Sequence, residues 1–549
     1  MSTAAYTVPE LAPEPQAPER TVYLIASGDL RESANVAGWP TQVALERVLT
    51  DAFAANGWKV VRANEVDPAT GHGFISSQRM GLDVFATIPP DAPLVVAEAV
   101  WQYSHHVLAG LRTHRGPVLT AANFAGDWPG LVGLLGLNAG MTKMGRDYST
   151  VWTVDGTDSW FQDAVRSWVT TGTIEHDASH VHPLPALPAS PEQQLGEALA
   201  AQLRREKAII GVFDEGCMGM YNAIFDDELL NGLGIYKERL SQSALWAEMQ
   251  RVSDAEADDV QRWLEDAGMT FRLGTDDATE LTGAQLRWQH KMYVAALRIA
   301  DDFGLDAVGI QYQQGLKDLS PASDLAEGLL NNVQRPPVRS RDGERVLWDG
   351  QAFPHFNEAD EGVAVDALVT NRLWTAMGLD PATTLHDVRW GEEYDGQFVW
   401  VLEISGSVPA SHLEGGYAGA EGWRQDPVFF PAGGSTINGV CRPGEIVWSR
   451  VYIADGVLQV DLGRASVVSL PAEETQRRKQ ATNPEWPIMH AVLHGVSRDQ
   501  FMARHKANHL NVAYAPDAET ADRALTAKAA LFAGLGMPVH VCGETTLTR

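Results

Sequence analysis

The feature that most constrains the fold of this chain is a change in hydrophobic pattern near residue 355. Before that point, short apolar runs alternate with amphipathic segments of helical length; after it, short runs alternate apolar and polar residues. The first pattern is typical of parallel sheets covered by helices, and the second of antiparallel strands. We therefore predict an α/β fold, with two open parallel-sheet α/β domains followed by a β-rich C-terminal domain.

The first 180 residues show the alternation of strands and helices most clearly. Residues 1–20 are rich in Pro, Ala and Glu and predict a flexible N-terminal arm. The strand-like run TVYLIAS begins at Thr21; a loop and an amphipathic helix follow, and then a second strand, WKVVRANEV. The strands APLVVAEAV and GPVLTAAN flank another helix. We predict an α/β domain over residues 21–180 with a mostly parallel sheet.

Residues 181–354 predict a second α/β domain. The segment 176–193, rich in Pro, His and Ser, interrupts the pattern and marks the boundary. The strand-like runs AIIGVFD and DAVGIQYQ enclose several segments of helical periodicity. The glycine-containing run GVFDEGCMGMYN lacks the lysine and Ser/Thr of a P-loop and the spacing of a dinucleotide fingerprint, so we interpret it as a strand-to-helix turn.

Residues 355–549 predict the β-rich C-terminal domain. The runs QFVWVLEISG, EIVWSRVYI and GVLQVDLGRASVVSLP alternate in the manner of antiparallel strands. We expect them to form a barrel or a sandwich, followed by closing helices.

Composition limits the class of function. Hydrophobic residues make up 45% and charged residues 21% of the chain, as in folded globular proteins. The net charge of −29, without a basic stripe, argues against a nucleic-acid partner. No apolar run reaches the roughly 20 residues of a membrane span, and no secretory signal pattern is present, so we expect no membrane partner and a cytoplasmic location. The three cysteines, Cys217, Cys441 and Cys542, are widely spaced, which predicts buried thiols.

Three side chains are candidates for a metal site, although each also has an ordinary structural interpretation. Glu358 lies in HFNEADEG just before a helix-like run, where carboxylates commonly cap helices. Asp387 lies at a strand end near Arg389, its natural salt-bridge partner, and His509 stands alone in RHKANHLNVAY. Taken together, two carboxylates and one imidazole suit a divalent ion that keeps open positions for oxygen ligands. Spacing alone does not assemble them.

The chain resembles the L-fucose isomerase family of metal-dependent ketol isomerases. NEADEGVAV, HDVRW and KANHLNVAY resemble the family segments that supply two carboxylate ligands and one histidine ligand. Further similar segments follow in the same order along the chain: GDLRESAN, GIQYQQGLKD, AEGLLNN, VFFPAGGSTINGV and TNPEWP. Because these matches are ordered over most of the chain, they are far more specific than any single motif.

The resemblance implies an aldose-ketose isomerase that interconverts an open-chain aldose and its 2-ketose through an enediol. Its cofactor would be Mn²⁺ or another divalent cation held by Glu358, Asp387 and His509, and Glu358 and Asp387 would be the catalytic residues. The implied substrate-binding residues are Arg31, Gln311, Trp486 and Asn508. The implied assembly is a homo-oligomer, a hexamer, in which Arg31 reaches the pocket of the neighbouring subunit and the small-molecule sugar is the only other partner.

Departures from the family pattern leave the substrate open. The family's Gln-Gly-Gln-Arg-type segment appears here as QYQQG, and its glycine-rich tyrosine-containing loop appears as PAGGSTIN. One alternative is the same reaction on an anionic sugar, such as sulfoquinovose to sulfofructose. The others are a metal-dependent sugar lyase or epimerase, and a non-catalytic sugar-binding protein, which would not need all three metal ligands.

Overall fold

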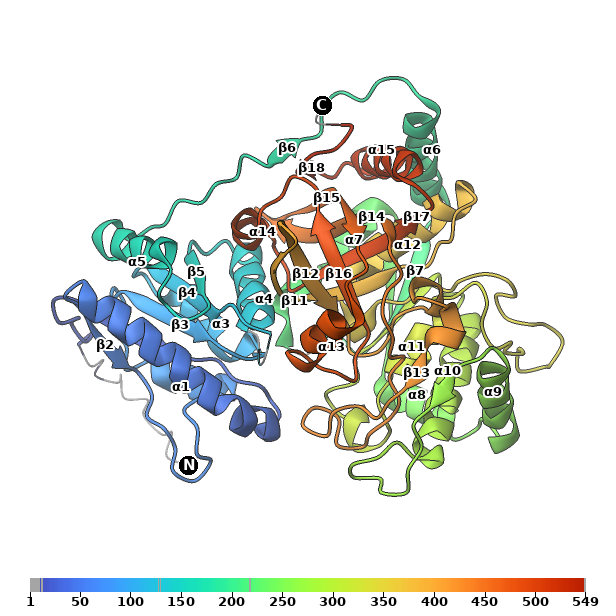
Figure 1. Cartoon of the computed structure of the whole chain (residues 1–549), viewed down its shortest axis with the longest axis horizontal. Helices are drawn as coiled ribbons and strands as arrows, with labels where there is room; N and C mark the ends of the chain where they lie inside the picture. The colour runs from blue at the N-terminus through green and yellow to red at the C-terminus, as the bar shows by residue number, and fades with distance from the viewer. Residues whose placement is uncertain (1–9, 11–12, 127, 129, 217–218, 548–549) are drawn as a thin grey trace, which may run out of the picture.

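The computed structural model describes residues 10, 13–126, 128, 130–216 and 219–547. The fold of the described residues is mixed α/β, with a five-stranded and a three-stranded parallel sheet and one larger mixed sheet (Figure 1). A short parallel pair is formed by β9 (Thr270–Phe271) and β13 (Glu421–Gly422). Part of the predicted N-terminal arm lies outside the described residues. Residues 13–20, its described end, are exposed and contain no helix or strand, and the first strand begins at Thr21 as predicted.

The N-terminal part contains a parallel sheet, as the sequence predicted; it has five strands in the order β2-β1-β3-β4-β5. Its strands are β1 (Thr21–Ile25), β2 (Lys59–Arg62), β3 (Leu94–Glu98), β4 (Val118–Asn123) and β5 (Ser149–Thr153). Its helices are α1 (Glu32–Ala55), α2 (Gln78–Phe85), α3 (His105–Thr113), α4 (Gly130–Lys143) and α5 (Ser159–Thr171).

Helix α1 differs from the prediction of a loop followed by a helix. It begins at Glu32 and continues through Pro40, which has no N–H for the helical ladder. Contacts outside the helical ladder hold the early turns: Ser33 Oγ donates to the Val428 carbonyl at 2.7 Å, and His72 Nε2 lies 3.0 Å from Glu32 Oε1. The side chain of Asn35 also accepts from the Asp29 amide at 2.8 Å and donates to the Asp29 carbonyl at 2.9 Å. Packing therefore overrides the local propensity.

The middle part contains a three-stranded parallel sheet in the order β10-β7-β8. Its strands are β7 (Ala208–Phe213), β8 (Ile235–Leu240) and β10 (Ala307–Ile310). Helices surround it: α7 (Asp227–Leu233), α8 (Gln242–Met249), α9 (Asp254–Asp266), α10 (Gly283–Phe303) and α11 (Asp324–Leu330). The run after β7 leads through a short 3-10 turn at Tyr221–Ala223 into α7, as the predicted turn requires; Cys217 lies outside the described residues.

The C-terminal part is built on a closed ring of six antiparallel strands, so of the two forms predicted the structure has the barrel. In ring order these are β14 (Gly444–Ala454), β17 (His509–Ala515), β11 (Thr384–Tyr394), β12 (Gln397–Glu403), β16 (Ile488–Leu493) and β15 (Val457–Val467). The associated helices are α12 (Glu361–Ala376), α13 (Ala472–Gln480), α14 (Arg498–Arg504) and α15 (Ala518–Gly534).

Two elements from the middle of the sequence join this C-terminal part. The first is strand β6 (Val181–Pro183), which pairs with β18 (Val539–Cys542). Strand β18 itself runs parallel to β15. Helix α6 (Pro191–Glu206) lies beside α15, where Gly196 approaches the Ala527 carbonyl (Figure 1). Residues 181–206, within the predicted second domain, thus pack against the barrel side of the molecule.

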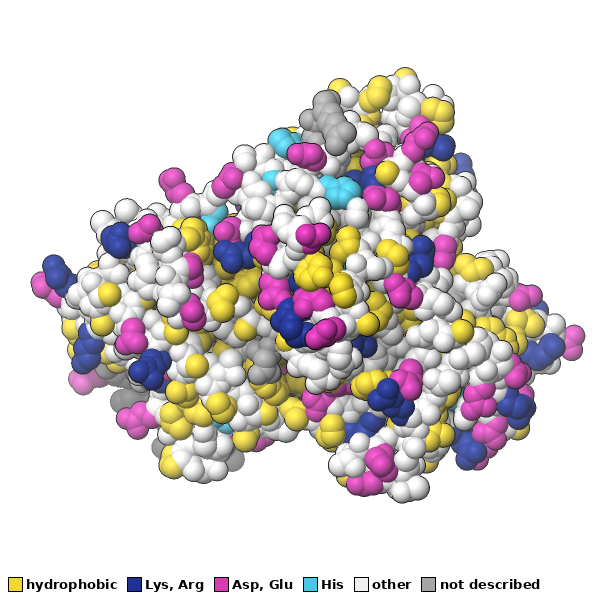
Figure 2. Space-filling model, in the orientation of Figure 1, with side chains coloured by type: hydrophobic (Ala, Val, Ile, Leu, Met, Phe, Trp, Pro, Cys, Tyr) yellow, Lys and Arg dark blue, Asp and Glu magenta, His cyan; other side chains and the backbone are white. Residues whose placement is uncertain are grey.

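Acidic and basic side chains are interspersed over the face shown in Figure 2. Among the described helices, none combines the length and the apolar character that a bilayer crossing requires. Cys441 and Cys542 are buried free thiols, as predicted.

A buried histidine predicts acid sensitivity of the fold. Burial of His290 on α10 lowers its pKa from 6.5 to about 4. Because protonation then favours the unfolded chain, the stability is fully present above pH 6.5 and is lost as the pH falls toward 4. We expect His290 to remove about 2 kcal/mol of unfolding free energy between pH 7.5 and pH 5. Urea unfolding of the wild type and of His290→Leu at both pH values measures this contribution, because the loss of unfolding free energy between the two pH values should be about 2 kcal/mol smaller in the variant.

Candidate metal and active site

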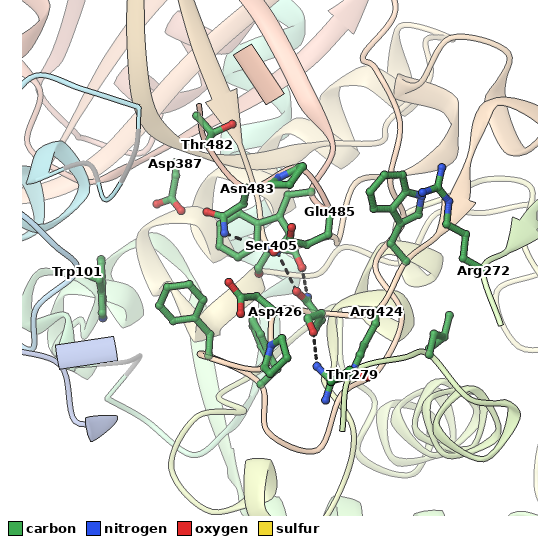
Figure 3. Close-up of a pocket in the computed structure, with 18 of the residues that line it drawn as sticks. Trp101, Arg272, Thr279, Asp387, Ser405, Arg424, Asp426, Thr482, Asn483 and Glu485 are labelled. Atoms are coloured by element: carbon green, nitrogen blue, oxygen red, sulfur yellow. Dashed lines mark hydrogen bonds between the residues drawn. The ribbon is translucent and has the colours of Figure 1, made fainter. Parts of the chain in front are cut away.

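A cavity of about 740 Å³ lies where the three parts of the chain meet. The C-terminal part contributes Glu358 and Asp387, and the N-terminal part contributes Arg31, Trp101 and Trp128. The middle part closes the opposite end with Arg272 and Thr279 (Figure 3). A cavity of this size with converging polar groups is typical of a small-molecule site.

Asp387 and His509 come together because of strand register. They are direct partners on the antiparallel strands β11 and β17. Opposed residues of such a pair point to the same face of the sheet, so two side chains far apart in the sequence become neighbours. His509 Nε2 lies 3.4 Å from Asp387 Oδ1. The barrel thus supplies one carboxylate and the imidazole from rigid elements.

Glu358 reaches the same point from an unusual turn. It lies in a short 3-10 segment, Asn357–Ala359, immediately before α12. Both Glu358 (φ 57°) and Ala359 (φ 54°) adopt left-handed backbone conformations, which cost energy in non-glycine residues and cluster at functional sites. The turn brings Glu358 Oε2 to 3.5 Å from His509 Nε2. The predicted set of three side chains is therefore gathered around one imidazole nitrogen.

The residues of this set fit a divalent cation. His509 Nε2 is buried and has no hydrogen-bond partner among the described residues, although two carboxylates approach it. As they stand, no three or more His, Cys, Asp or Glu side chains of the described part form a group that could hold a metal ion. Donors at about 2.1 Å from one ion lie about 3 Å apart, so Glu358 and Asp387 must each close by a few tenths of an ångström. Such a movement of two carboxylates is a small rearrangement, and a bound cation would give the orphaned nitrogen a partner.

Behind His509 lies a carboxylate that the sequence interpretation missed. Asp360 Oδ2 lies 2.8 Å from His509 Nδ1 and accepts from Arg450 Nη1 at 2.6 Å. Asp360 Oδ1 caps α12 by accepting from the amides of Gly362 and Val363. A carboxylate on the far nitrogen of a histidine fixes the tautomer that leaves Nε2 free to bind a metal. The acids of NEADEG predict a helix cap, but the sequence does not indicate that Asp360 contacts His509.

Burial and charge shift the titration of these groups. Burial alone would lower the pKa of His509, but the hydrogen bond with Asp360 and the approach of Asp387 and Glu358 raise it well above its ordinary value. Burial raises the pKa of Glu358, although His509 opposes the shift. Despite burial, Arg450 and His509 hold the pKa of Asp360 well below its usual range. The acids around His509 therefore favour the protonated form of its imidazole.

Arg31 lines the cavity of its own chain. Its guanidinium binds Asp29 through two contacts of 2.9 and 2.6 Å and lies over the Phe429 ring at 4.9 Å. The positive charge of Arg31 opposes the rise that burial causes in the pKa of Glu358, so the two groups lie within electrostatic reach. Within one chain, Arg31 thus belongs to the same site as the predicted metal ligands.

Trp486 lies on the cavity wall and in the core at once. It is 7% exposed and donates from Nε1 to Gln425 Oε1 at 2.8 Å. The Arg389 guanidinium lies over its ring at 5.2 Å, and Arg389 Nη2 donates to Asn483 at 2.8 Å. Core packing and substrate contact are therefore compatible for this residue.

Gln311 and Asn508 are not among the residues that line the cavity. Gln311 follows β10 and is fully buried, where its side chain accepts from the Gln314 amide at 3.2 Å. Asn508 is also fully buried, and its Nδ2 donates to Asp387 Oδ1 at 3.4 Å. Asn508 therefore helps to orient the predicted ligand Asp387, and Gln311 stabilises the loop after β10.

No protein-family model and no curated protein matches this chain.

Proposed function

We propose that this protein is a metal-dependent aldose-ketose isomerase whose divalent cation, Mn²⁺ or a similar ion, is held by Glu358, Asp387 and His509. The observation that carries the proposal is the orphaned Nε2 of His509, faced by two carboxylates and backed by Asp360. Two oxygen ligands and one imidazole suit a cation that accepts further oxygen ligands. The ordered resemblance to the L-fucose isomerase family supports the same chemistry and the arrangement of two α/β domains before a metal-bearing domain.

In the proposed mechanism, one residue moves the proton and others orient the metal ligands. When bound, the cation draws electron density from the carbonyl and neighbouring hydroxyl of an open-chain sugar, which acidifies the C2 proton. Glu358, whose pKa burial raises, takes that proton and delivers it to C1. Asp387 is oriented by Asn508, and His509 by Asp360. The aromatic wall of Trp101, Trp128 and Trp486 excludes water from the reacting carbons.

An assay with Mn²⁺ tests the reaction class. A panel of L-fucose, D-arabinose, L-rhamnose and sulfoquinovose is followed by NMR for ketose, with EDTA as the control. We expect EDTA-sensitive conversion of one sugar in D₂O, with deuterium at C1 of the ketose. Complete retention of a C2 label at C1 would contradict the enediol route. No conversion, with Mn²⁺ shown to be bound, would favour a lyase, an epimerase or a binding protein.

Metal binding is also expected to stabilise the fold, because the three ligands converge only in the folded chain. At a free Mn²⁺ concentration of 100 times Kd, the unfolding free energy should rise by about 2.7 kcal/mol. Thermal unfolding with and without Mn²⁺ measures this gain. His509→Gln should abolish it, whereas His182→Gln, an exposed histidine of β6, should retain it. An equal gain in both variants would exclude His509 as a ligand.

A further inference from the structure

A serine on the cavity wall connects the cavity to a buried acid. Ser405 follows the end of β12, is 5% exposed and lines the cavity near its centre (Figure 3). Its Oγ donates to Asp324 Oδ1 at 2.5 Å and accepts from Asn357 Nδ2 at 3.3 Å. A hydroxyl has one donor and two acceptor positions, so one lone pair of Ser405 remains for a group in the cavity.

Asp324, the first residue of α11, is closed off from solvent behind Ser405. It is 3% exposed, and its second oxygen accepts from Gln425 Nε2 at 2.9 Å. Burial raises the pKa of Asp324 to about 7, against the opposing hydrogen bond from Ser405, and the negative charge of Glu358 adds to the rise. A carboxyl group with this pKa can accept and return a proton near neutral pH.

The proposed isomerisation leaves one proton without a carrier. Glu358 moves a proton from C2 to C1, but conversion of an aldose to a ketose also requires the O2 hydroxyl to lose its proton and O1 to gain one. In the proposed mechanism Glu358 moves the carbon-bound proton and Asp387 binds the cation, so neither is assigned this second transfer. A second proton-accepting group at the cavity wall would complete the reaction.

We propose that Ser405 and Asp324 form a relay that carries the hydroxyl proton of the substrate from O2 to O1, an inference that rests on the proposed isomerase function. The O2–H bond breaks as its proton passes to Ser405 Oγ, while the Ser405 proton passes to the Asp324 carboxylate. The charge left on the substrate is withdrawn into the new C2 carbonyl as C1 is protonated. The reverse transfer from Asp324 through Ser405 protonates O1. Ser405 and Asp324 thereby return to their starting protonation states.

Asp324 could instead serve only as a support. Through Gln425 it connects to Trp486, because Gln425 donates to Asp324 and accepts from Trp486 Nε1. A support would affect every step of the reaction equally. A relay affects only movement of the hydroxyl proton, so exchange at C2 continues when the relay is removed.

The test compares two reactions of one sample in D₂O with Mn²⁺ and the sugar that the wild type converts. NMR follows deuterium entering C2 of the recovered aldose, which needs only Glu358, and formation of ketose, which needs the relay as well. In Asp324→Asn we expect ketose formation to fall roughly 100- to 1,000-fold, while C2 exchange falls far less. Ser405→Ala, which removes one hydroxyl, should show the same separation even where Asp324→Asn folds poorly.

Asp318→Asn is the matched control, because Asp318 is an exposed acid that pairs with Lys317. It should leave both rates unchanged. Equal loss of exchange and conversion in Ser405→Ala and Asp324→Asn would overturn the relay and leave Asp324 a structural support. Wild-type rates in Ser405→Ala would overturn it as well. A wild-type protein that neither exchanges nor converts any sugar would overturn the proposed function and the relay with it.

Discussion

Glu358→Gln is expected to reduce kcat/KM for the aldose by roughly 1,000-fold or more, because it removes both a ligand of the cation and the base that takes the C2 proton. Glutamine has nearly the same shape and can occupy the same left-handed turn, which already accommodates a non-glycine side chain at φ 57°. Loss of activity would therefore not arise from a new backbone strain. Steady-state kinetics at saturating Mn²⁺, with metal content measured on the same sample, give the result.

The control for this variant is Glu344→Gln, which makes the same change at an exposed position outside the cavity. It should retain wild-type kinetics. Turnover of Glu358→Gln at the wild-type rate would contradict the role of Glu358 as the base. Full loss of turnover with Mn²⁺ still bound would favour catalysis over a purely sugar-binding protein.

Much of the fold could be predicted because hydrophobic period reports local structure directly. Runs such as APLVVAEAV and GPVLTAAN are buried on both faces and could only be central strands of a covered sheet. The start of α1 could not be predicted, because Pro40 opposes a helix locally and contacts such as that of Ser33 with the Val428 carbonyl, far along the chain, help to hold it. Closure of the barrel depends on pairing between β14 and β17, which no local pattern contains.

The candidate site also combines residues that could be predicted from the sequence with residues that could not. Resemblance brought Glu358, Asp387 and His509 together, and the pairing of β11 with β17 explains why two of them meet. Asp360 was missed because its capping role is sufficient to explain its position in the sequence, whereas its contact with His509 spans 149 residues. Asp324 and Ser405 were missed for the same reason, being 81 residues apart. Gln311 lies outside the cavity wall, where its side-chain oxygen accepts from the Gln314 amide in the loop that follows β10.

Asp360→Asn is expected to weaken both the fold and metal binding. Asparagine is also a good helix cap, so α12 should keep its N-terminus, and the change removes chiefly the negative charge. Arg450 is 1% exposed, and its Nε and Nη2 have no hydrogen-bond partner in the described part of the chain, so it would be left as a buried, uncompensated cation. We expect the unfolding free energy to fall by about 3–5 kcal/mol and Mn²⁺ affinity to fall about 10- to 100-fold.

The double variant Asp360→Asn/Arg450→Met separates these two effects. Replacing the stranded guanidinium with an apolar side chain should recover most of the lost stability, because no charge is then buried without a partner. It should not recover Mn²⁺ affinity, because His509 Nδ1 still lacks the carboxylate that fixes its tautomer. Urea unfolding and titration calorimetry on the three proteins measure both quantities. Recovery of affinity together with stability would mean that Asp360 serves the fold alone, whereas stability without affinity would mean that it orients the metal ligand.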